Sequence, residues 1–250
     1  MPVVIVTGAA GGLGTATVAH LTAREAQVVA LDLDAAGLAA TRAAAPNPDL
    51  VTTIVADASD EQAIAGAISD TVGTFGGLDA IFLNAAVEGP IARVESIELE
   101  DYERTMRINV RSVFLGLKHA IPHLRATRGA ALSTASTGGM MGWPGISPYV
   151  ASKHAVIGLT RGVALENAEA GVRVNALCPG PLDTRMLWAI GDAVTPGDRA
   201  EQQRQFEATI PAGRLGRPEE AAAFATWLLL DAPAYLTGAV LPIDGAQTTG

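Results

Sequence analysis

The sequence predicts a single α/β domain with a doubly wound parallel sheet of seven strands and helices on both faces. Short runs of Val, Ile, Leu and Ala alternate along the chain with Ala- and Leu-rich stretches of helical length, which is the pattern of βαβ units. The short runs are almost continuously apolar, as parallel strands are when helices cover both of their faces. Of the 250 residues, 49% are hydrophobic and 17% are charged, so one core can account for the whole chain.

The seven short apolar runs are the expected strands. They lie at residues 3–6, 28–31, 51–55, 80–83, 130–134, 172–177 and 239–243. The stretches between them have the Ala and Leu content that favours helices. These helices are expected at residues 14–24, 34–45, 59–74, 99–125, 149–170 and 218–230. No internal repeat or low-complexity linker interrupts the alternation, so residues 1–250 are expected to form one domain.

Composition excludes several classes of partner. The net charge is −9 and the 17 Lys and Arg residues are scattered, so nucleic acid is not an expected partner. The longest apolar run, residues 221–230, is about half of the roughly 18–20 residues that cross a bilayer, and no secretion signal precedes the first strand. The only cysteine is Cys178, which excludes an intrachain disulfide. We therefore expect a cytoplasmic protein without a membrane partner.

A glycine-rich turn, Thr7-Gly8-Ala9-Ala10-Gly11-Gly12-Leu13-Gly14, joins the first strand to the first helix. Gly8 permits a tight turn, Gly12 lets the backbone approach a pyrophosphate, and Gly14 lets the helix and strand pack closely. The amino end of the helix then faces the anion. Such a turn can also be an ordinary structural loop, but its position after a strand favours a Rossmann dinucleotide site.

Asp32 ends the second strand about twenty residues beyond these glycines, where a carboxylate can accept hydrogen bonds from the adenosine ribose. Asp32 would also repel the 2′-phosphate of NADP, and the residue that follows it, Leu33, carries no positive charge. NAD is therefore the expected cofactor. The alternative is that Asp32 only caps the helix starting at Asp34. Asp57, after the third strand, could accept a hydrogen bond from the adenine amino group or serve only in a turn.

Tyr149 and Lys153 are the expected centre of the chemistry. Their spacing of four residues places both side chains on one helical face, where the ammonium can lower the pKa of the phenol and make it a general acid or base. Ser136 closes a strand thirteen residues earlier, from where its hydroxyl could hold the substrate oxygen. Asn109 is a polar residue in an apolar segment of the long middle helix.

Taken together, these motifs resemble the short-chain dehydrogenase/reductase family over essentially the whole chain. The glycine turn resembles the family's cofactor loop, and Asn84-Ala85-Ala86 resembles its Asn-Ala-Gly element. Ser136, Tyr149 and Lys153 correspond to the catalytic trio, and Asn109 to the fourth catalytic residue. The resemblance implies that Tyr149 exchanges a proton with the substrate oxygen during hydride transfer, that Lys153 also binds the nicotinamide ribose, and that Asn109 holds a water linking Lys153 to solvent.

The segment Pro179-Gly180-Pro181-Leu182-Asp183-Thr184 resembles the family's Pro-Gly-x-x-x-Thr motif, which contacts the nicotinamide carboxamide. Ala86 and Ala246 occupy positions where the family usually has glycine. Ala86 could change the shape of the pocket, and Ala246 lies in a region that packs between subunits in relatives. The residues expected to contact the cofactor are Gly8, Gly12, Leu13, Gly14, Asp32, Asp57, Ala58, Asn84, Ala85, Tyr149, Lys153, Pro179, Gly180, Leu182 and Thr184.

Residues 185–210 are expected to form a lid over the substrate, although a surface helical hairpin that covers core is an equal alternative. Apolar residues here and before Tyr149 predict an apolar pocket. The expected substrate contacts are Ser136, Met141, Trp143, Tyr149 and Trp188. Packing beneath the lid is the alternative role of the methionine and tryptophans. Glu88 could contact a hydroxylated substrate, but an exposed loop carboxylate is the preferred interpretation.

The predicted function is NAD-dependent interconversion of a cyclic or apolar secondary alcohol and its ketone, without a metal. A 3-oxoacyl thioester reductase and a polyol dehydrogenase of the same family are alternatives, although the former commonly uses NADPH. A non-catalytic dinucleotide sensor is the alternative from another class, and the intact tyrosine and lysine argue against it. Relatives pair through helices corresponding to 99–125 and 149–170, which implies a homo-oligomer, with a tetramer preferred over a dimer.

Overall fold

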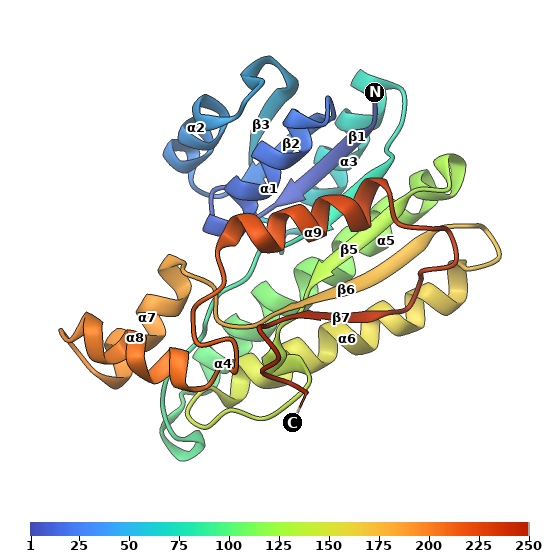
Figure 1. Ribbon diagram of the computed structural model, residues 1–250. Helices are drawn as coiled ribbons and strands as arrows, with labels where there is room; N and C mark the ends of the chain where they lie inside the picture. The colour runs from blue at the N-terminus through green and yellow to red at the C-terminus, as the bar shows by residue number, and fades with distance from the viewer. Residues whose placement is uncertain (250) are drawn as a thin grey trace.

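The computed structural model describes residues 1–249 and contains, within them, a seven-stranded sheet in the order β3-β2-β1-β4-β5-β6-β7 (Figure 1). All neighbouring strands are parallel. The strands are β1 (Val3–Thr7), β2 (Gln27–Asp32), β3 (Val51–Val55), β4 (Ala80–Leu83), β5 (Ala130–Thr134), β6 (Arg173–Pro179) and β7 (Val240–Ile243). The predicted parallel, doubly wound sheet is confirmed.

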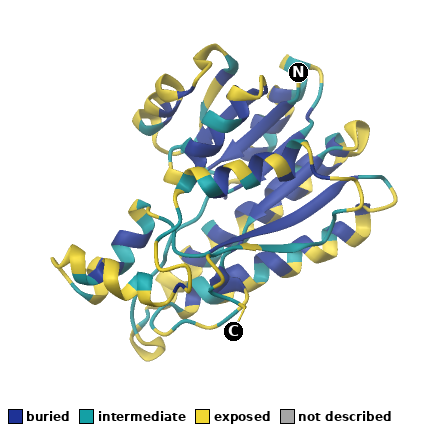
Figure 2. Ribbon diagram, in the orientation of Figure 1, coloured by how far each residue is buried: buried dark blue, intermediate teal, exposed yellow. Residues whose placement is uncertain are grey.

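Helices cover both faces of this sheet, and the buried residues follow the strands between them (Figures 1 and 2). One face carries α1 (Gly12–Ala23), α2 (Ala35–Ala44) and α9 (Pro218–Leu230). The other carries α3 (Glu61–Phe75), α5 (Ser112–Thr127) and α6 (Ser147–Asn167). No helix among residues 1–249 combines the length and apolar character needed to cross a membrane.

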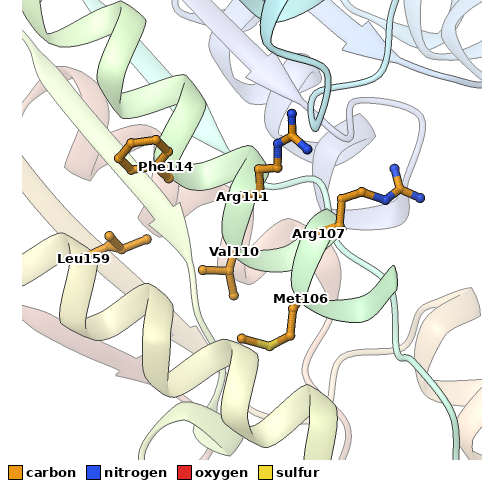
Figure 3. A pocket seen from close by; sticks show the side chains of 6 residues that line it. All are labelled: Met106, Arg107, Val110, Arg111, Phe114 and Leu159. Carbon is orange, nitrogen blue, oxygen red and sulfur yellow. The ribbon is translucent and has the colours of Figure 1, made fainter. Parts of the chain in front are cut away.

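The long middle helix differs from the prediction of one regular helix over 99–125. It consists of α4 (Leu99–Met106), a π-helical segment η3 (Arg107–Arg111), and α5. The apolar pattern continues through the π-helical segment, so periodicity gave no sign of it. Figure 3 shows Arg107, Val110 and Arg111 of this segment beside Met106 and Phe114 and opposite Leu159 of α6, where they line a surface pocket.

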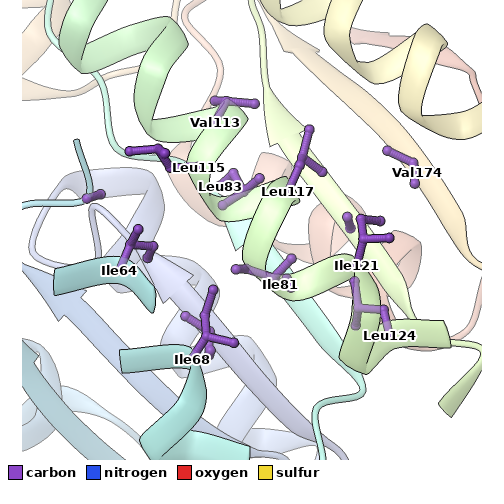
Figure 4. Packing of buried hydrophobic residues seen from close by; sticks show 14 of the residues in the cluster. Ile64, Ile68, Ile81, Leu83, Val113, Leu115, Leu117, Ile121, Leu124 and Val174 are labelled. Carbon is purple, nitrogen blue, oxygen red and sulfur yellow. The ribbon is translucent and has the colours of Figure 1, made fainter. Parts of the chain in front are cut away.

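Alternation along β1 divides the core into two layers. Val4 and Val6 contact the layer beneath α1, α2 and α9, whereas Ile5 contacts the layer beneath α3, α5 and α6. Figure 4 shows the second layer, in which Ile64 of α3 and Leu117 of α5 pack over the sheet. Because each strand is buried on both faces, its sequence lacks polar alternation, which explains why the apolar runs predicted strands.

The segment expected as a lid forms a hairpin of two helices, α7 (Arg185–Val194) and α8 (Arg199–Ala208). This hairpin extends beyond the carboxyl ends of the strands (Figure 1). Buried Gln202 joins the two helices, because its Nε2 donates to Asp192 Oδ1 and to the Thr195 carbonyl oxygen, both at 2.8 Å. These hydrogen bonds hold α7 and α8 together, so the two helices are expected to move as a single unit. The shorter segments are η1 (Pro48–Leu50), η2 (Val94–Ser96) and η4 (Thr137–Gly139).

Ala246 occupies a backbone conformation that favours glycine, with a φ of 72°. A Cβ atom in the left-handed region costs about 1–2 kcal/mol, and glycine recovers most of this cost despite its greater freedom in the unfolded chain. We expect Ala246→Gly to stabilise the protein by about 1 kcal/mol and to raise its Tm by about 2–4 °C, measured by thermal unfolding.

The control is Ala40→Gly, because Ala40 is an exposed residue in the middle of α2. Glycine in a helix interior should lower stability by about 1 kcal/mol, so the two substitutions should act in opposite directions. A fall in Tm for both variants would contradict the role assigned to the Ala246 conformation.

Candidate active site

The strand order reverses between β1 and β4, which have their loops at the same edge of the sheet. In open α/β sheets, ligands bind beyond the carboxyl ends of the strands at such a reversal. The predicted cofactor and catalytic residues come from loops at this edge and from the helices that follow them. The sequence therefore places its expected site where this fold binds ligands.

Two glycines of the turn after β1 are required by close backbone contacts. Gly8 has a φ of +65°, and a Cβ atom on it would lie 2.8 Å from Ala85 Cα. A Cβ atom on Gly14 would lie 2.1 Å from the Gly8 carbonyl oxygen. Asn84 Nδ2 donates to that same oxygen at 3.1 Å, and Thr7 Oγ1 accepts from the Asn84 backbone N–H at 2.9 Å. The turn and the Asn84-Ala85 element thus form one rigid unit.

The amino end of α1 fits a pyrophosphate. Its N-cap residue, Gly11, provides no side-chain cap, and its first turn contains no acidic residue. The free backbone N–H groups there favour an anion. A Cβ atom on Gly12 would lie 3.1 Å from Thr184 Cγ2, so this turn closely faces the loop after β6. Leu13, in the first turn of α1, is buried and packs the helix against the core.

Asp32 lies beside the glycine turn. Its Oδ2 accepts from the Ala10 backbone N–H at 3.0 Å, and its Oδ1 accepts from the Asp34 N–H at 3.1 Å. The cap of α2 is Asp34, whose Oδ1 accepts from the Gly37 N–H at 3.0 Å. The interpretation of Asp32 as that helix cap is therefore wrong, and each of its oxygens keeps a lone pair for a ribose hydroxyl.

Asp57 forms the turn after β3 that was its alternative role. Its Oδ1 accepts from the Ser59 N–H at 2.8 Å and from the Ser59 hydroxyl at 2.7 Å. Its Oδ2 lies 3.5 Å from Arg107 Nη1, which also donates to Ser59 Oγ at 3.0 Å. Ala58, between Asp57 and Ser59 in the sequence, is buried. Sequence analysis missed Arg107, because only the fold brings η3 to this turn.

The phenol of Tyr149 lies with Ser136 at the end of β5. The Ser136 hydroxyl lies close to the phenol ring, because a Cβ atom on Gly138 would lie 3.5 Å from both Ser136 Oγ and Tyr149 Cε1. Burial is the largest influence on the Tyr149 pKa and raises it; Ser136 lowers the pKa, and the Glu88 charge raises it further. This result corrects the expectation that the pKa of Tyr149 is lowered.

Lys153 is buried one helical turn after Tyr149, and its Nζ lies 5.5 Å from the centre of the Tyr149 ring. It donates to the Thr134 carbonyl oxygen at 2.8 Å, which leaves two donors free. Burial lowers the pKa of Lys153 to about 8. Removal from water is therefore the largest influence on the pKa of each group.

Asn109 is fully buried in η3, and its amide binds protein groups. Oδ1 accepts from the Val87 N–H at 2.8 Å, while Nδ2 donates to the Val87 carbonyl oxygen at 2.9 Å and to Ser152 Oγ at 3.0 Å. Ser152 Oγ in turn donates to the Tyr149 carbonyl oxygen at 2.7 Å. The Asn109 side chain therefore links the loop after β4 to the catalytic helix, a role that sequence analysis did not predict.

The expected nicotinamide loop follows β6. Pro179 is buried, and a Cβ atom on Gly180 would lie 2.9 Å from Asp244 Cα, so this loop packs tightly against the end of β7. Leu182 forms an isolated parallel bridge with Gly216. Thr184 caps α7, with its Oγ1 3.5 Å from the Leu187 N–H. The end of this loop is thereby joined to the α7–α8 hairpin.

Trp188 is buried within this hairpin rather than left free at its surface. Its Nε1 donates to Asp183 Oδ1 at 2.6 Å, its ring meets Phe206 edge to face at 6.2 Å, and the Arg199 guanidinium lies 3.1 Å from the ring centre. These contacts favour a packing role for Trp188. Met141 and Trp143 are partly exposed in the loop between Ser136 and α6.

Glu88 differs from the exposed carboxylate that the sequence predicted, because its side chain is only 18% exposed. Its two oxygens lie 3.4 and 3.5 Å from the guanidinium of Arg185, the first residue of α7. Its charge is close enough to raise the pKa of Tyr149, after burial and against Ser136. Within residues 1–249, no group of three or more His, Cys, Asp or Glu side chains could hold a metal ion.

Comparison with known proteins agrees with this geometry. A family model described as "Enoyl-(Acyl carrier protein) reductase" matches residues 8–248. A levodione reductase of Leifsonia aquatica is 37% identical over 251 residues, which cover 98% of this chain and 94% of that protein. A 2,5-dichloro-2,5-cyclohexadiene-1,4-diol dehydrogenase of Sphingobium indicum is 38% identical over 248 residues, which cover 98% and 96% of the two chains.

Solved structures are similar over the same length. The crystal structure of a levodione reductase has a TM-score of 0.97 and 37% identity, covering 100% of this chain and 98% of that one. A 3-ketoacyl-(acyl-carrier-protein) reductase from Brucella melitensis, complexed with NADH, has a TM-score of 0.90 and 29% identity, covering 99% and 98%. Because the family match, the relatives and the fold all extend over nearly the whole chain, it belongs to the short-chain dehydrogenase/reductase family, as an oxidoreductase of alcohols and ketones.

Proposed function

We propose that this protein uses NAD to interconvert cyclic or otherwise apolar secondary alcohols and their ketones, with Tyr149 as general acid and base. The observation that carries the proposal is the assembly of Tyr149, Ser136 and Lys153 beside a dinucleotide cradle that ends in Asp32. A dinucleotide sensor would need the cradle but not a half-buried phenol beside a buried ammonium, because burial of the Lys153 charge is costly without a chemical use.

The roles of the side chains follow from these contacts. In alcohol oxidation, the Tyr149 phenolate removes the hydroxyl proton, and in ketone reduction the phenol returns it. The Ser136 hydroxyl holds the substrate oxygen beside the phenol. The Lys153 ammonium, fixed by the Thr134 carbonyl, stabilises the phenolate and offers its two remaining donors to the cofactor ribose. Bound NAD or NADH accepts or supplies the hydride.

NAD is preferred over NADP in this proposal because of Asp32. Its carboxylate is held by the Ala10 and Asp34 backbone N–H groups, and the following residue, exposed Leu33, offers no positive charge for a 2′-phosphate. The backbone of the glycine turn and the Asp32 carboxylate would hold the adenosine half of the cofactor. Thr184 and the loop after β6 would hold the nicotinamide half. The Brucella melitensis structure, similar in fold, contains NADH.

The apolar substrate class is supported by the residues near Tyr149 and by the names of relatives. In this proposal Met141 and Trp143, in the loop before α6, would contact the substrate, and the α7–α8 hairpin would act as the lid. A cyclohexanol dehydrogenase of the same family is 32% identical to this chain. Polyols and 3-oxoacyl thioesters are the alternative substrates within the family.

The test is an absorbance assay at about 340 nm with NAD and NADP, using cyclic alcohols, steroids, polyols and 3-hydroxyacyl thioesters, and the matching ketones in reverse. We expect turnover of cyclic alcohols with NAD. Turnover of thioesters or linear polyols alone would select an alternative substrate class. Tight NADH binding without any turnover would favour the sensor.

The two reaction directions should depend differently on pH. Because burial raises the pKa of Tyr149, the phenol is protonated at neutral pH. Oxidation requires the phenolate, so log kcat/KM for oxidation should rise with pH by up to about 1 per pH unit. Reduction requires the protonated phenol, so its rate should stay nearly constant below the raised pKa of Tyr149 and should slow only as the pH approaches that pKa. Measurement of both directions between about pH 6 and 10 tests this, with Tyr149→Phe as the control whose residual rate should lose the dependence. A falling oxidation rate would reverse the assigned protonation states.

Self-association through the helical face of α4, α5 and α6 is also proposed, with a tetramer preferred over a dimer. The surface pocket there is lined by the apolar Met106, Val110, Phe114 and Leu159 together with Arg107 and Arg111, and Phe114 is 49% exposed (Figure 3). Light scattering tests the number of subunits. A cytoplasmic location is proposed because the one cysteine, Cys178, is buried as a free thiol.

A further inference from the structure

Glu88 is a partly buried carboxylate for which the proposed mechanism has no use. It follows Val87, the residue that Asn109 binds through both of its backbone groups. Asn109 also donates to Ser152, which donates to the Tyr149 carbonyl oxygen. This chain of hydrogen bonds fixes the backbone of the Glu88 loop relative to the catalytic helix, so the carboxylate is held in place rather than carried on a free loop.

On its other side, Glu88 meets the substrate lid. Arg185 follows Thr184 of the nicotinamide loop and begins α7, and its guanidinium lies 3.4–3.5 Å from the two Glu88 oxygens. The Arg185 side chain is 76% exposed, whereas that of Glu88 is 18% exposed. The carboxylate is therefore the inner member of the pair, situated between the catalytic helix and the first residue of the lid.

A carboxylate in this position can only accept hydrogen bonds while it is ionised. Arg185 balances its charge, so the group that best matches it is a neutral donor rather than a second cation. An alcohol whose reacting hydroxyl lies against Tyr149 presents carbon and hydrogen to Glu88, unless the substrate carries another hydroxyl. We propose that Glu88 determines specificity by accepting a hydrogen bond from a second hydroxyl of the substrate, so that the preferred alcohols are cyclic diols.

This proposal rests on the proposed alcohol dehydrogenase function and narrows it. The position of Glu88 near the Tyr149 phenol is supported by its effect on the pKa of Tyr149. Burial raises this pKa most, Ser136 lowers it, and the Glu88 charge raises it by a smaller amount. Hydrogen bonds to an ionised group contribute more than those between neutral groups, and a site built for a substrate hydroxyl discriminates against analogues that lack it.

The experiment compares kcat/KM for cyclohexanol, the cis and trans isomers of cyclohexane-1,2-diol and cyclohexane-1,4-diol, and 2-aminocyclohexanol. The wild-type protein should prefer at least one diol over cyclohexanol by about tenfold or more. In Glu88→Gln and Glu88→Ala, the ratio of diol to cyclohexanol should fall by about tenfold. The matched control is Glu95→Gln, because Glu95 forms an exposed pair with Arg93 in the same loop; its ratio should equal that of the wild type.

A second measurement does not depend on turnover. The affinity of the preferred diol for the NADH complex of Tyr149→Phe, measured by calorimetry, should decrease about tenfold when Glu88→Gln is added, with circular dichroism confirming the fold. An unchanged ratio in the Glu88 variants, equal use of diols and cyclohexanol, or preference for 2-aminocyclohexanol would overturn the proposal while leaving the dehydrogenase function intact. Failure of every alcohol and ketone with wild-type protein would remove both.

Discussion

Replacement of Tyr149 by phenylalanine should abolish most turnover while leaving NADH binding unchanged. The substitution removes only the hydroxyl, so the ring still packs against Gly138 and the helix α6 is retained. General acid–base groups contribute about 10²–10⁴-fold, and the phenol is the group to which this proposal assigns proton transfer beside Ser136. We therefore expect kcat to fall by about 10³-fold in both directions, measured by the NADH absorbance assay.

The chain contains three tyrosines, which provides a matched control. Tyr235 is fully exposed, so Tyr235→Phe should retain wild-type activity. NADH binding to each variant can be followed by cofactor fluorescence. A Tyr149→Phe variant with more than about a tenth of wild-type turnover would remove Tyr149 from its assigned role, because no acid–base group of this importance is so dispensable.

Exchange of Asp32-Leu33 for Ala-Arg should convert the preferred cofactor from NAD to NADP. The double substitution removes the charge that repels a 2′-phosphate and supplies a guanidinium that can bind it with two hydrogen bonds. Like charges in contact cost several kcal/mol, so the ratio of kcat/KM for NADP to that for NAD should rise by about 10²–10³-fold. Weaker use of NAD is also expected, since the Ala10 and Asp34 N–H groups lose their acceptor.

Asp34→Asn is the control for this exchange. It removes a negative charge two residues from Asp32 but keeps a side chain that can cap α2. Its cofactor ratio should remain that of the wild type. If both variants shifted the ratio equally, general surface charge would explain the preference, and Asp32 would have no specific role in recognising the ribose.

The features that follow from local sequence were predicted well. The seven strands were identified because each is buried on both faces and is therefore apolar throughout. Helix α6 was predicted over 149–170 from the Ala- and Leu-rich stretch after the fifth strand, although it begins at Ser147, where Pro148 suits the first turn, and ends at Asn167. For residues 185–210 the sequence left a lid and a surface helical hairpin as equal alternatives; the structure forms a hairpin of two helices there, whose bounds the sequence did not predict.

The features that depend on distant contacts were not predicted. The π-helical segment around Asn109 and the contact of Arg107 with Asp57 require elements that meet only in the fold. The direction of the Tyr149 pKa shift was wrong because spacing reveals a neighbouring ammonium but not the loss of water around the phenol. Glu88 was expected at the surface, and its partner Arg185 lies on another element.

The strand order also affects how the protein is made. β1 leaves the ribosome before the other six strands but occupies the middle of the sheet, and its second neighbour, β4, begins at Ala80, which pairs with Val4. Until β4 is synthesised, β1 has an unpaired edge with apolar residues on both faces, which is the type of surface that aggregates or recruits chaperones. Translation that stalls before Leu83 should therefore yield aggregation-prone fragments, although the finished protein buries every one of those residues in β1.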